Sequence, residues 1–139
     1  MAALRVAVLA TAGFSPFHFS VPCILFGSAL PQQDLFHVDI CALEPGPVIS
    51  DMGLSITVEQ GLDPLDQADI IIVPYWHNPA EKPAQALLDK LVAAWQRGAE
   101  IVGLCLGTYV LAYAGLLDKH RAATHWEFER DFSERFPQV

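Results

Sequence analysis

A cysteine between two glycines is the pattern in this sequence that could most directly do chemistry. Cys105 stands in "GLCLG", residues 103–107, between the apolar run "EIVGLC" and the helical pattern "LGTYVLAYAG". This order of strand, small-residue turn and helix is typical of a strained turn that exposes one nucleophilic side chain. We expect Cys105 to face the positive end of the following helix, which would stabilise its thiolate and lower its pKa.

Two further kinds of group would complete acyl-transfer chemistry at this turn. The backbone N–H of Leu106, together with one from the Tyr75–Trp76 turn, could stabilise an oxyanion. His125 ends the next extended stretch, where its imidazole could act as a base for the thiol. However, cysteine is among the residues most often buried, and a lone histidine commonly bonds to a backbone group. On the residues alone, both interpretations stay open.

The other histidines and cysteines form no recognisable metal site. The candidates are His37, His77, His120, Cys23 and Cys41. Their spacing matches no pattern of metal ligands, so we expect no bound metal. His77, in "PYWHNP", could contact a small ligand together with Trp76, although an exposed loop residue is the simpler interpretation. No phosphate loop or dinucleotide-binding pattern occurs, so we also expect no cofactor.

Alternating strand and helix patterns must position these groups. Short apolar runs rich in β-branched residues predict parallel strands at 4–10, 35–43, 68–74 and 100–105. Helical spacing of apolar residues predicts helices at 19–30, with Pro22 in its first turn, and at 84–98, 106–115 and 127–136. Short extended pieces are expected at 44–50, 54–59 and 122–125. Trp95 and Phe26 fall on apolar helical stripes and are expected in the core. This alternation predicts an α/β fold whose ligands collect at the carboxyl ends of the strands.

Composition and charge favour a single soluble domain over residues 1–139. The chain has 139 residues, of which 53% are hydrophobic and 17% charged, enough to form one buried core. Its formal net charge of -8 repels phosphate, so we expect no direct contact with nucleic acid. Three cysteines without a Cys-x-x-Cys pair favour free thiols in the cytoplasm. No apolar run reaches the roughly 18 residues of a membrane-spanning helix, so we expect no membrane partner.

Three stretches of the chain resemble a known family. "ADIIIVPYW", "RGAEIVGLCLGTYVLAYAGLLD" and "RAATHWEFERDFSERFP" are similar to the ThiJ/PfpI superfamily, also called class I glutamine-amidotransferase-like. More narrowly, they resemble the N-terminal domain of AraC-type transcriptional regulators. The resemblance implies a flavodoxin-like three-layer sandwich with a mostly parallel sheet, assembled as a homodimer, with Cys105 at the turn and His125 beside it. It also implies further strands, a helix and a helix-turn-helix DNA-binding part beyond Val139, so we expect the chain to be truncated.

The chain departs from the superfamily pattern at positions that bear on catalysis. The superfamily usually places a carboxylate in the helix after the first strand, and counting back from Pro22 puts His18 at that position. No acidic residue occurs between Gly13 and Gly27. Tyr75 stands, with the tryptophan after it, where hydrolytic relatives tend to have glycines. These departures favour binding over catalysis.

The resemblance and its departures together predict a sensor. We expect the N-terminal domain of an AraC-type regulator, with a small-molecule effector bound near the cysteine turn and DNA contacted only through a separate domain. The predicted ligand-binding residues are His18, Tyr75, Trp76, Cys105, Leu106 and His125. One alternative is a cysteine-dependent hydrolase, amidase or isonitrile hydratase with Cys105 as nucleophile and His125 as base. Another is an oxidant sensor that uses a low-pKa Cys105 thiolate.

Overall fold

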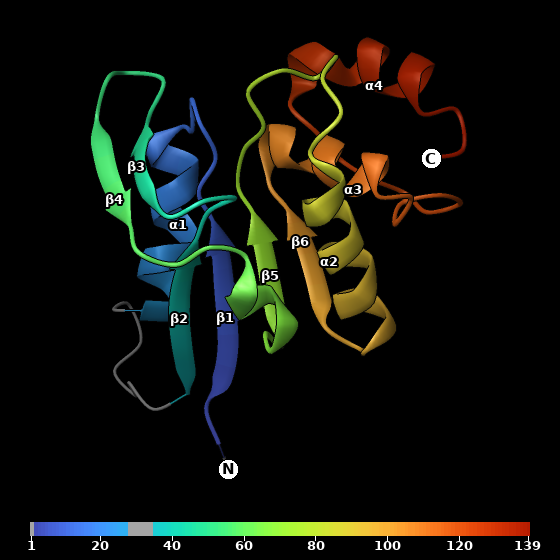
Figure 1. The fold of residues 1–139 in the computed structure, drawn as a ribbon. Coiled ribbons are helices and arrows are strands. Elements are labelled where there is room, and N and C mark those ends of the chain that lie inside the picture. The colour runs from blue at the N-terminus through green and yellow to red at the C-terminus, as the bar shows by residue number, and fades with distance from the viewer. Residues whose placement is uncertain (1, 28–34) are drawn as a thin grey trace.

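Four parallel strands form the central sheet. The computed structural model describes residues 2–27 and 35–139. The strands, in the order β2-β1-β5-β6 across the sheet (Figure 1), are β1 (Leu4–Leu9), β2 (Phe36–Cys41), β5 (Ile70–Val73) and β6 (Glu100–Gly103). In register, Val6 pairs with Ile70 and with Val38 on its two sides. The four strands predicted from apolar runs are therefore present and, as expected, parallel.

A small hairpin stands beside the carboxyl end of this sheet. Its strands, β3 (Gly46–Ile49) and β4 (Ser55–Val58), are antiparallel. They correspond to the two short extended pieces expected at 44–50 and 54–59. The Ile49 carbonyl accepts a hydrogen bond from the Gly13 N–H at 2.8 Å, and the Asp51 N–H donates to the Phe14 carbonyl at 3.0 Å. These bonds attach the hairpin to the loop that follows β1.

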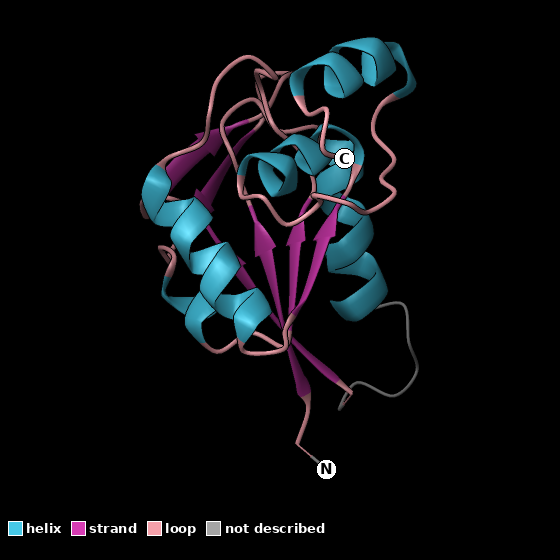
Figure 2. Cartoon of the chain, turned by 90° about the vertical axis from the view of Figure 1, so that its right-hand side faces the viewer, coloured by secondary structure: helices cyan, strands magenta, loops and turns pink. Residues whose placement is uncertain are grey.

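Helices cover both faces of the sheet, which confirms the three-layer prediction. Figure 2 shows α1 (Pro16–Gly27) on one side and α2 (Gln85–Gln96) on the other. Side chains alternate along the strands, because successive residues of a strand point to opposite faces. Val6, Val8 and Ile72 pack with α1, whereas Ala7, Leu9, Ile71 and Val73 join the larger core on the opposite face. That larger core also receives α3 (Thr108–Tyr113).

The last helix, α4 (Glu129–Arg135), is held by an aromatic cluster and one buried hydroxyl. It follows a 3-10 turn over 126–128 and falls within the helix predicted at 127–136. The ring of Tyr109 in α3 packs edge-on against Phe132, with 5.0 Å between ring centroids. Its hydroxyl donates to the Asp131 carboxylate at 2.7 Å. Asp131 in turn accepts from Arg135 at 2.9 Å.

Three expectations about the helices need correction or restriction. First, α1 begins at Pro16 rather than at residue 19, so Pro22 lies in the helix interior and not in its first turn. Pro16 suits the first helical position, because the N–H that proline lacks would have no partner there. The Pro22 ring is fully buried. Second, Trp95 is 55% exposed, because Ala94 takes the inward position in the last turn of α2. Third, the predicted helix residues 28–30 lie outside the described part of the chain. Phe26 packs against the core as expected, although it is only partly buried.

No helix within residues 2–27 and 35–139 combines the length and the apolar character needed to cross a bilayer.

Candidate functional site

The turn at Cys105 has the sharp geometry expected from its glycines. Cys105 begins a 3-10 turn between β6 and α3 and has a φ of 51°, a left-handed conformation that is costly for a side chain other than glycine. A Cβ on Gly107 would lie 1.8 Å from the Val73 carbonyl oxygen, and one on Gly103 would lie 2.9 Å from the Thr108 Cα. Glycine at 107 lets the turn pack this closely against β5, and glycine at 103 lets the end of β6 approach the start of α3.

The thiol at this turn is not activated, contrary to the expectation of a stabilised thiolate. Burial raises the pKa of Cys105, and the hydrogen bond from the Leu106 N–H opposes this with a smaller lowering effect. The following α3 has only six residues, so its dipole is weak. The expected lowering of the pKa is therefore wrong. The Leu106 N–H does face the sulfur, as the sequence suggested.

His125 lies near this turn along the chain, but its ring has another partner. The predicted extended piece at 122–125 joins no sheet, and the Thr124 hydroxyl donates to the Cys105 carbonyl at 3.0 Å. The His125 Nδ1 accepts from the Glu127 N–H at 3.2 Å and caps the next turn. Its ring also stacks on Trp126, with 6.0 Å between centroids. Within the described residues, no hydrogen bond joins His125 to Cys105.

Two other predicted site residues have their own surroundings. His18 is the third residue of α1, and its Nδ1 lies 2.9 Å from the Ser15 hydroxyl, a local contact at the start of the helix. Tyr75 does approach the cysteine turn, because a Cβ on Gly107 would lie 3.1 Å from the Tyr75 backbone nitrogen. Burial first, and then the charges of Asp51 and Cys105, raise the pKa of Tyr75. Asp51, in the turn between β3 and β4, was not singled out from the sequence. The turn residues around Asp51 indicated a loop in the sequence, but they did not show that this loop would lie near Tyr75.

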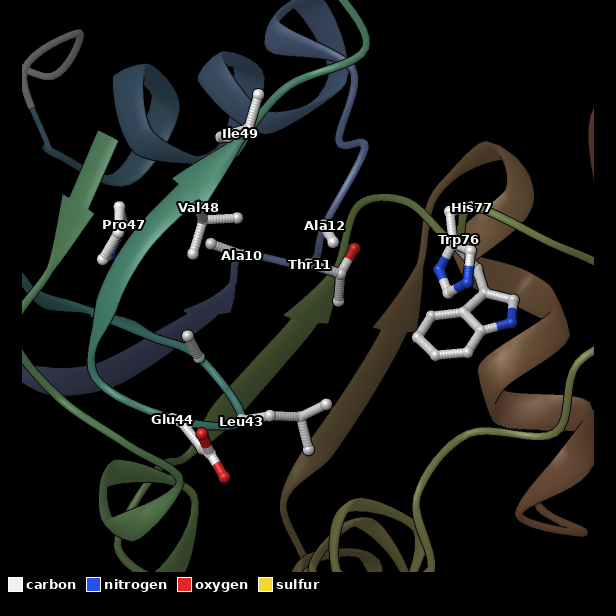
Figure 3. Close-up of a pocket in the computed structure, with 11 residues that line it drawn as sticks. Ala10, Thr11, Ala12, Leu43, Glu44, Pro47, Val48, Ile49, Trp76 and His77 are labelled. Atoms are coloured by element: carbon white, nitrogen blue, oxygen red, sulfur yellow. The ribbon is translucent and has the colours of Figure 1, made fainter. Parts of the chain in front are cut away.

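A cavity of about 350 Å³ opens at the same edge of the sheet, on the side away from the cysteine. Figure 3 shows residues from the ends of β1 and β2, from β3 and from the loop after β5 around it. The lining residues are Ala10, Thr11, Ala12, Ala42, Leu43, Glu44, Pro47, Val48, Ile49, Trp76 and His77. Of the six predicted ligand-binding residues, only Trp76 lines this cavity. His77, considered as a possible ligand contact, also lies on its wall.

Hydrogen bonds fix the wall that Trp76 and His77 form. The Trp76 indole N–H donates to the Glu81 carbonyl at 2.9 Å, and the His77 Nε2 lies 2.5 Å from the Glu81 carboxylate. The Thr11 hydroxyl donates to the Tyr75 carbonyl at 3.2 Å, which joins the loop after β1 to the loop after β5. The wall is therefore formed before any ligand arrives.

The described residues contain no group of three histidine, cysteine, aspartate or glutamate side chains placed to hold a metal ion. Cys41 is fully buried, and its pKa is raised to about 12, first by burial and then by the charge of Asp39. A thiol in that state takes no part in thiolate chemistry.

Comparison with known proteins agrees with this fold. The pattern of the DJ-1/PfpI family matches residues 4–138. The HTH-type transcriptional regulator CdhR of Pseudomonas aeruginosa is 34% identical over 108 residues, which are 78% of this chain and 32% of that protein. This chain thus spans about a third of that relative's length.

Two solved structures match nearly the whole chain. A putative transcriptional regulator from Vibrio parahaemolyticus has a TM-score of 0.84 and 28% identity, and the match covers 99% of this chain and 74% of that one. An AraC family transcriptional regulator from Pseudomonas putida has a TM-score of 0.80 and 28% identity, with coverage of 97% and 74%. On its sequence pattern and its fold, this chain belongs to the DJ-1/PfpI family, and the relatives it matches include AraC-type transcriptional regulators.

Proposed function

We propose that this chain is the effector-sensing domain of an AraC-type transcriptional regulator. The observation that carries the proposal is its similarity to an HTH-type regulator over 78% of the chain. The effector binds at the carboxyl edge of the sheet, where the Tyr75–Trp76 loop separates the cysteine turn from the cavity. His18 and His125 do not line this cavity, and the Nδ1 of each has a local partner. DNA is bound by another part of the regulator, in keeping with the acidic charge of this domain.

The enzymatic alternative is supported less well. A hydrolase or hydratase would need Cys105 as a thiolate nucleophile and His125 as its base. Burial raises the pKa of Cys105, and the His125 Nδ1 already accepts a backbone hydrogen bond. The oxidant-sensor alternative depends on the same thiolate and weakens for the same reason.

A thermal-shift screen combined with a transcription assay tests the proposed function. Purified chain is heated with a panel of small metabolites, and each metabolite that raises the Tm is then added to cells with and without the gene. We expect at least one metabolite to raise the Tm and to change transcript levels only when the gene is present. Cys105→Ser should preserve both effects. If that substitution instead abolishes turnover of an amide or isonitrile, the chain is an enzyme.

We also propose that two copies of the chain associate through α1. This helix contains no charged residue, and four apolar side chains at helical spacing are exposed on it. They are Phe17, Val21, Ile24 and Leu25. A contiguous apolar surface of this kind is typical of a protein interface. Sedimentation analysis should give a dimer for the unchanged chain and a monomer for Val21→Glu. A monomer in both cases contradicts the proposal.

A further inference from the structure

The cavity lies where the order of the sheet reverses. From β1 the chain proceeds to β2 on one side, whereas β5 pairs with β1 on the other side. The loops that leave β1 and β5 therefore diverge, and a crevice opens between them at the carboxyl ends of the strands. Thr11 and Ala12 come from the first loop, and Trp76 and His77 come from the second (Figure 3). The hairpin strand β3 closes the remaining side.

We infer that this cavity is the effector site, and that its ligand is a small aliphatic molecule with a hydrogen-bond donor and no negative charge. The inference rests on the proposed sensing function and adds both the place and the ligand chemistry to it. A volume of about 350 Å³ lies near the lower end for small-molecule pockets. The walls are mainly apolar, and the apolar lining residues are Ala10, Ala12, Ala42, Leu43, Pro47, Val48, Ile49 and Trp76.

Two side-chain and two backbone hydrogen-bond donors around the cavity are already in use. The Trp76 indole donates to the Glu81 carbonyl, and the Thr11 hydroxyl donates to the Tyr75 carbonyl. The backbone N–H groups of two further lining residues have partners of their own. The Ala10 N–H bonds to the Cys41 carbonyl at 2.8 Å, and the Ala42 N–H bonds to the Gln60 carbonyl at 3.1 Å. A ligand carboxylate or phosphate would therefore lose its water without gaining these donors.

The charges around the cavity point the same way. None of its described lining residues is lysine or arginine, and the His77 imidazole already has the Glu81 carboxylate as its partner. Glu44 is exposed and lies at the edge of the ring of lining residues in Figure 3, so its carboxylate can accept a hydrogen bond from a ligand group at the cavity rim. An anionic ligand would be repelled by Glu44, whereas an amide or ammonium group could donate to it.

Trp76 can report occupancy of the cavity by its fluorescence. Two other tryptophans occur, Trp95 and Trp126, and they are 55% and 79% exposed. Replacing both with phenylalanine leaves the buried Trp76, which is 4% exposed, as the single emitter. The probes are 4-methylpentanamide, 4-methylpentylamine and 4-methylpentanoate, which share one carbon skeleton and differ in charge. Each is titrated into the full chain while Trp76 emission is recorded.

We expect the amide and the amine to shift Trp76 emission and to bind at least about tenfold more tightly than the carboxylate. In Glu44→Lys the preference between amine and carboxylate should reverse. The matched control is Glu59→Lys, which makes the same charge change at an exposed residue outside the cavity lining and should keep the original order. Equal binding of all three probes, no change in Trp76 emission, or an order unaffected by Glu44→Lys would each overturn the inference.

The same titration separates this inference from the proposed function. A metabolite that changes transcription but leaves Trp76 emission unaltered would overturn the cavity as effector site, and the sensing function would stand. If the probes bind as described but no metabolite changes transcription, the sensing function is wrong and the cavity remains a binding site for uncharged or cationic molecules.

Discussion

The two halves of the sheet's carboxyl edge differ in how they are built. On one side, the turn at Cys105 is pressed against β5 so closely that Gly107 has no room for a methyl group. On the other side, the β3–β4 hairpin stands away from the ends of β1 and β2, and a cavity of about 350 Å³ remains between them. The cysteine turn thus lies where the packing is tight, and this cavity lies along the same edge, beside the hairpin. A recognisable turn does not by itself locate a cavity.

Gly107→Ala should have the largest effect on stability, because it adds a methyl group where the cysteine turn packs tightly against β5. The new Cβ would lie 1.8 Å from the Val73 carbonyl oxygen, so strand and turn must separate. We expect a loss of about 4 kcal/mol or more in the free energy of unfolding, measured by urea denaturation. Gly27→Ala is the matched control, because no atom of residues 2–27 or 35–139 outside its immediate neighbours lies within 4 Å of its Cβ position. If the two variants are equally stable, the turn is looser than described.

Alkylation of Cys105 should be slow at neutral pH. Because burial raises its pKa, the thiolate fraction at pH 7 is smaller than in a free cysteine, and the midpoint of labelling moves to higher pH. We expect a rate with iodoacetamide at pH 7 that is below that of an unstructured peptide thiol. Peptide mapping by mass spectrometry separates this site from Cys41, which should not react in the folded chain. A midpoint below that of the peptide would restore the enzyme interpretation.

Tyr109→Phe should weaken the docking of α4 without opening the core. The substitution removes the hydroxyl that donates to Asp131 and leaves the aromatic packing in place. We expect a loss of about 1 kcal/mol in the free energy of unfolding.

The same pair gives a pH dependence. The pKa of Asp131 is held below its usual value of 3.8, first by the hydrogen bond from Arg135 and then by the one from Tyr109. A lowered carboxyl pKa stabilises the fold above the unfolded-state value, and that stability is lost as the pH falls through the folded-state value. Denaturation series between pH 6 and about 2 should therefore show a weaker acid dependence in Tyr109→Phe. An identical dependence in both proteins would mean that the hydroxyl does not affect Asp131.

Glu81→Gln should have the smallest effect on stability. It tests whether the Glu81 side chain helps to position the cavity wall that Trp76 and His77 form. The Glu81 side chain is more than half exposed, so its pair with His77 contributes less than about 0.5 kcal/mol. The Glu81 carbonyl still accepts from the Trp76 indole, so Trp76 emission in the single-tryptophan variant should stay unchanged. A large red shift would show that the side chain, rather than the backbone, positions the indole.

Much of the fold could be predicted from local sequence. The run "IIIV" identified a strand, and the spacing of Leu87 and Leu91 identified a helix. Both signals arise because residues on a buried face are apolar and recur with the period of the strand or helix. The start of α1 and the exposure of Trp95 were missed. The start of α1 and the exposure of Trp95 both depend on which other segments pack against the end of a helix. The periodicity of apolar residues within the helix does not show which segments these are.

The site was predicted in part. The glycines around Cys105 revealed a tight strand-to-helix turn, whereas Trp76, predicted to bind a ligand beside Cys105, lines a cavity that the cysteine does not reach. The direction of the His125 ring was not predictable, because an adjacent backbone N–H competes for its nitrogen. The cavity as a whole was missed, since its lining residues come from segments far apart in the chain, and only Trp76 and His77 among them had been singled out from the sequence.

The sequence by itself determined the order of elements, the parallel sheet and the glycine requirement at the cysteine turn, because periodicity and backbone sterics are properties of neighbouring residues. The resemblance of three of its stretches to a known family pointed to the family. Tertiary structure alone decided the direction in which the pKa of Cys105 moves, the orientation of His125 and the position of the cavity. Burial, hydrogen-bond competition and empty volume arise only when segments distant in sequence pack together, so no local pattern records them.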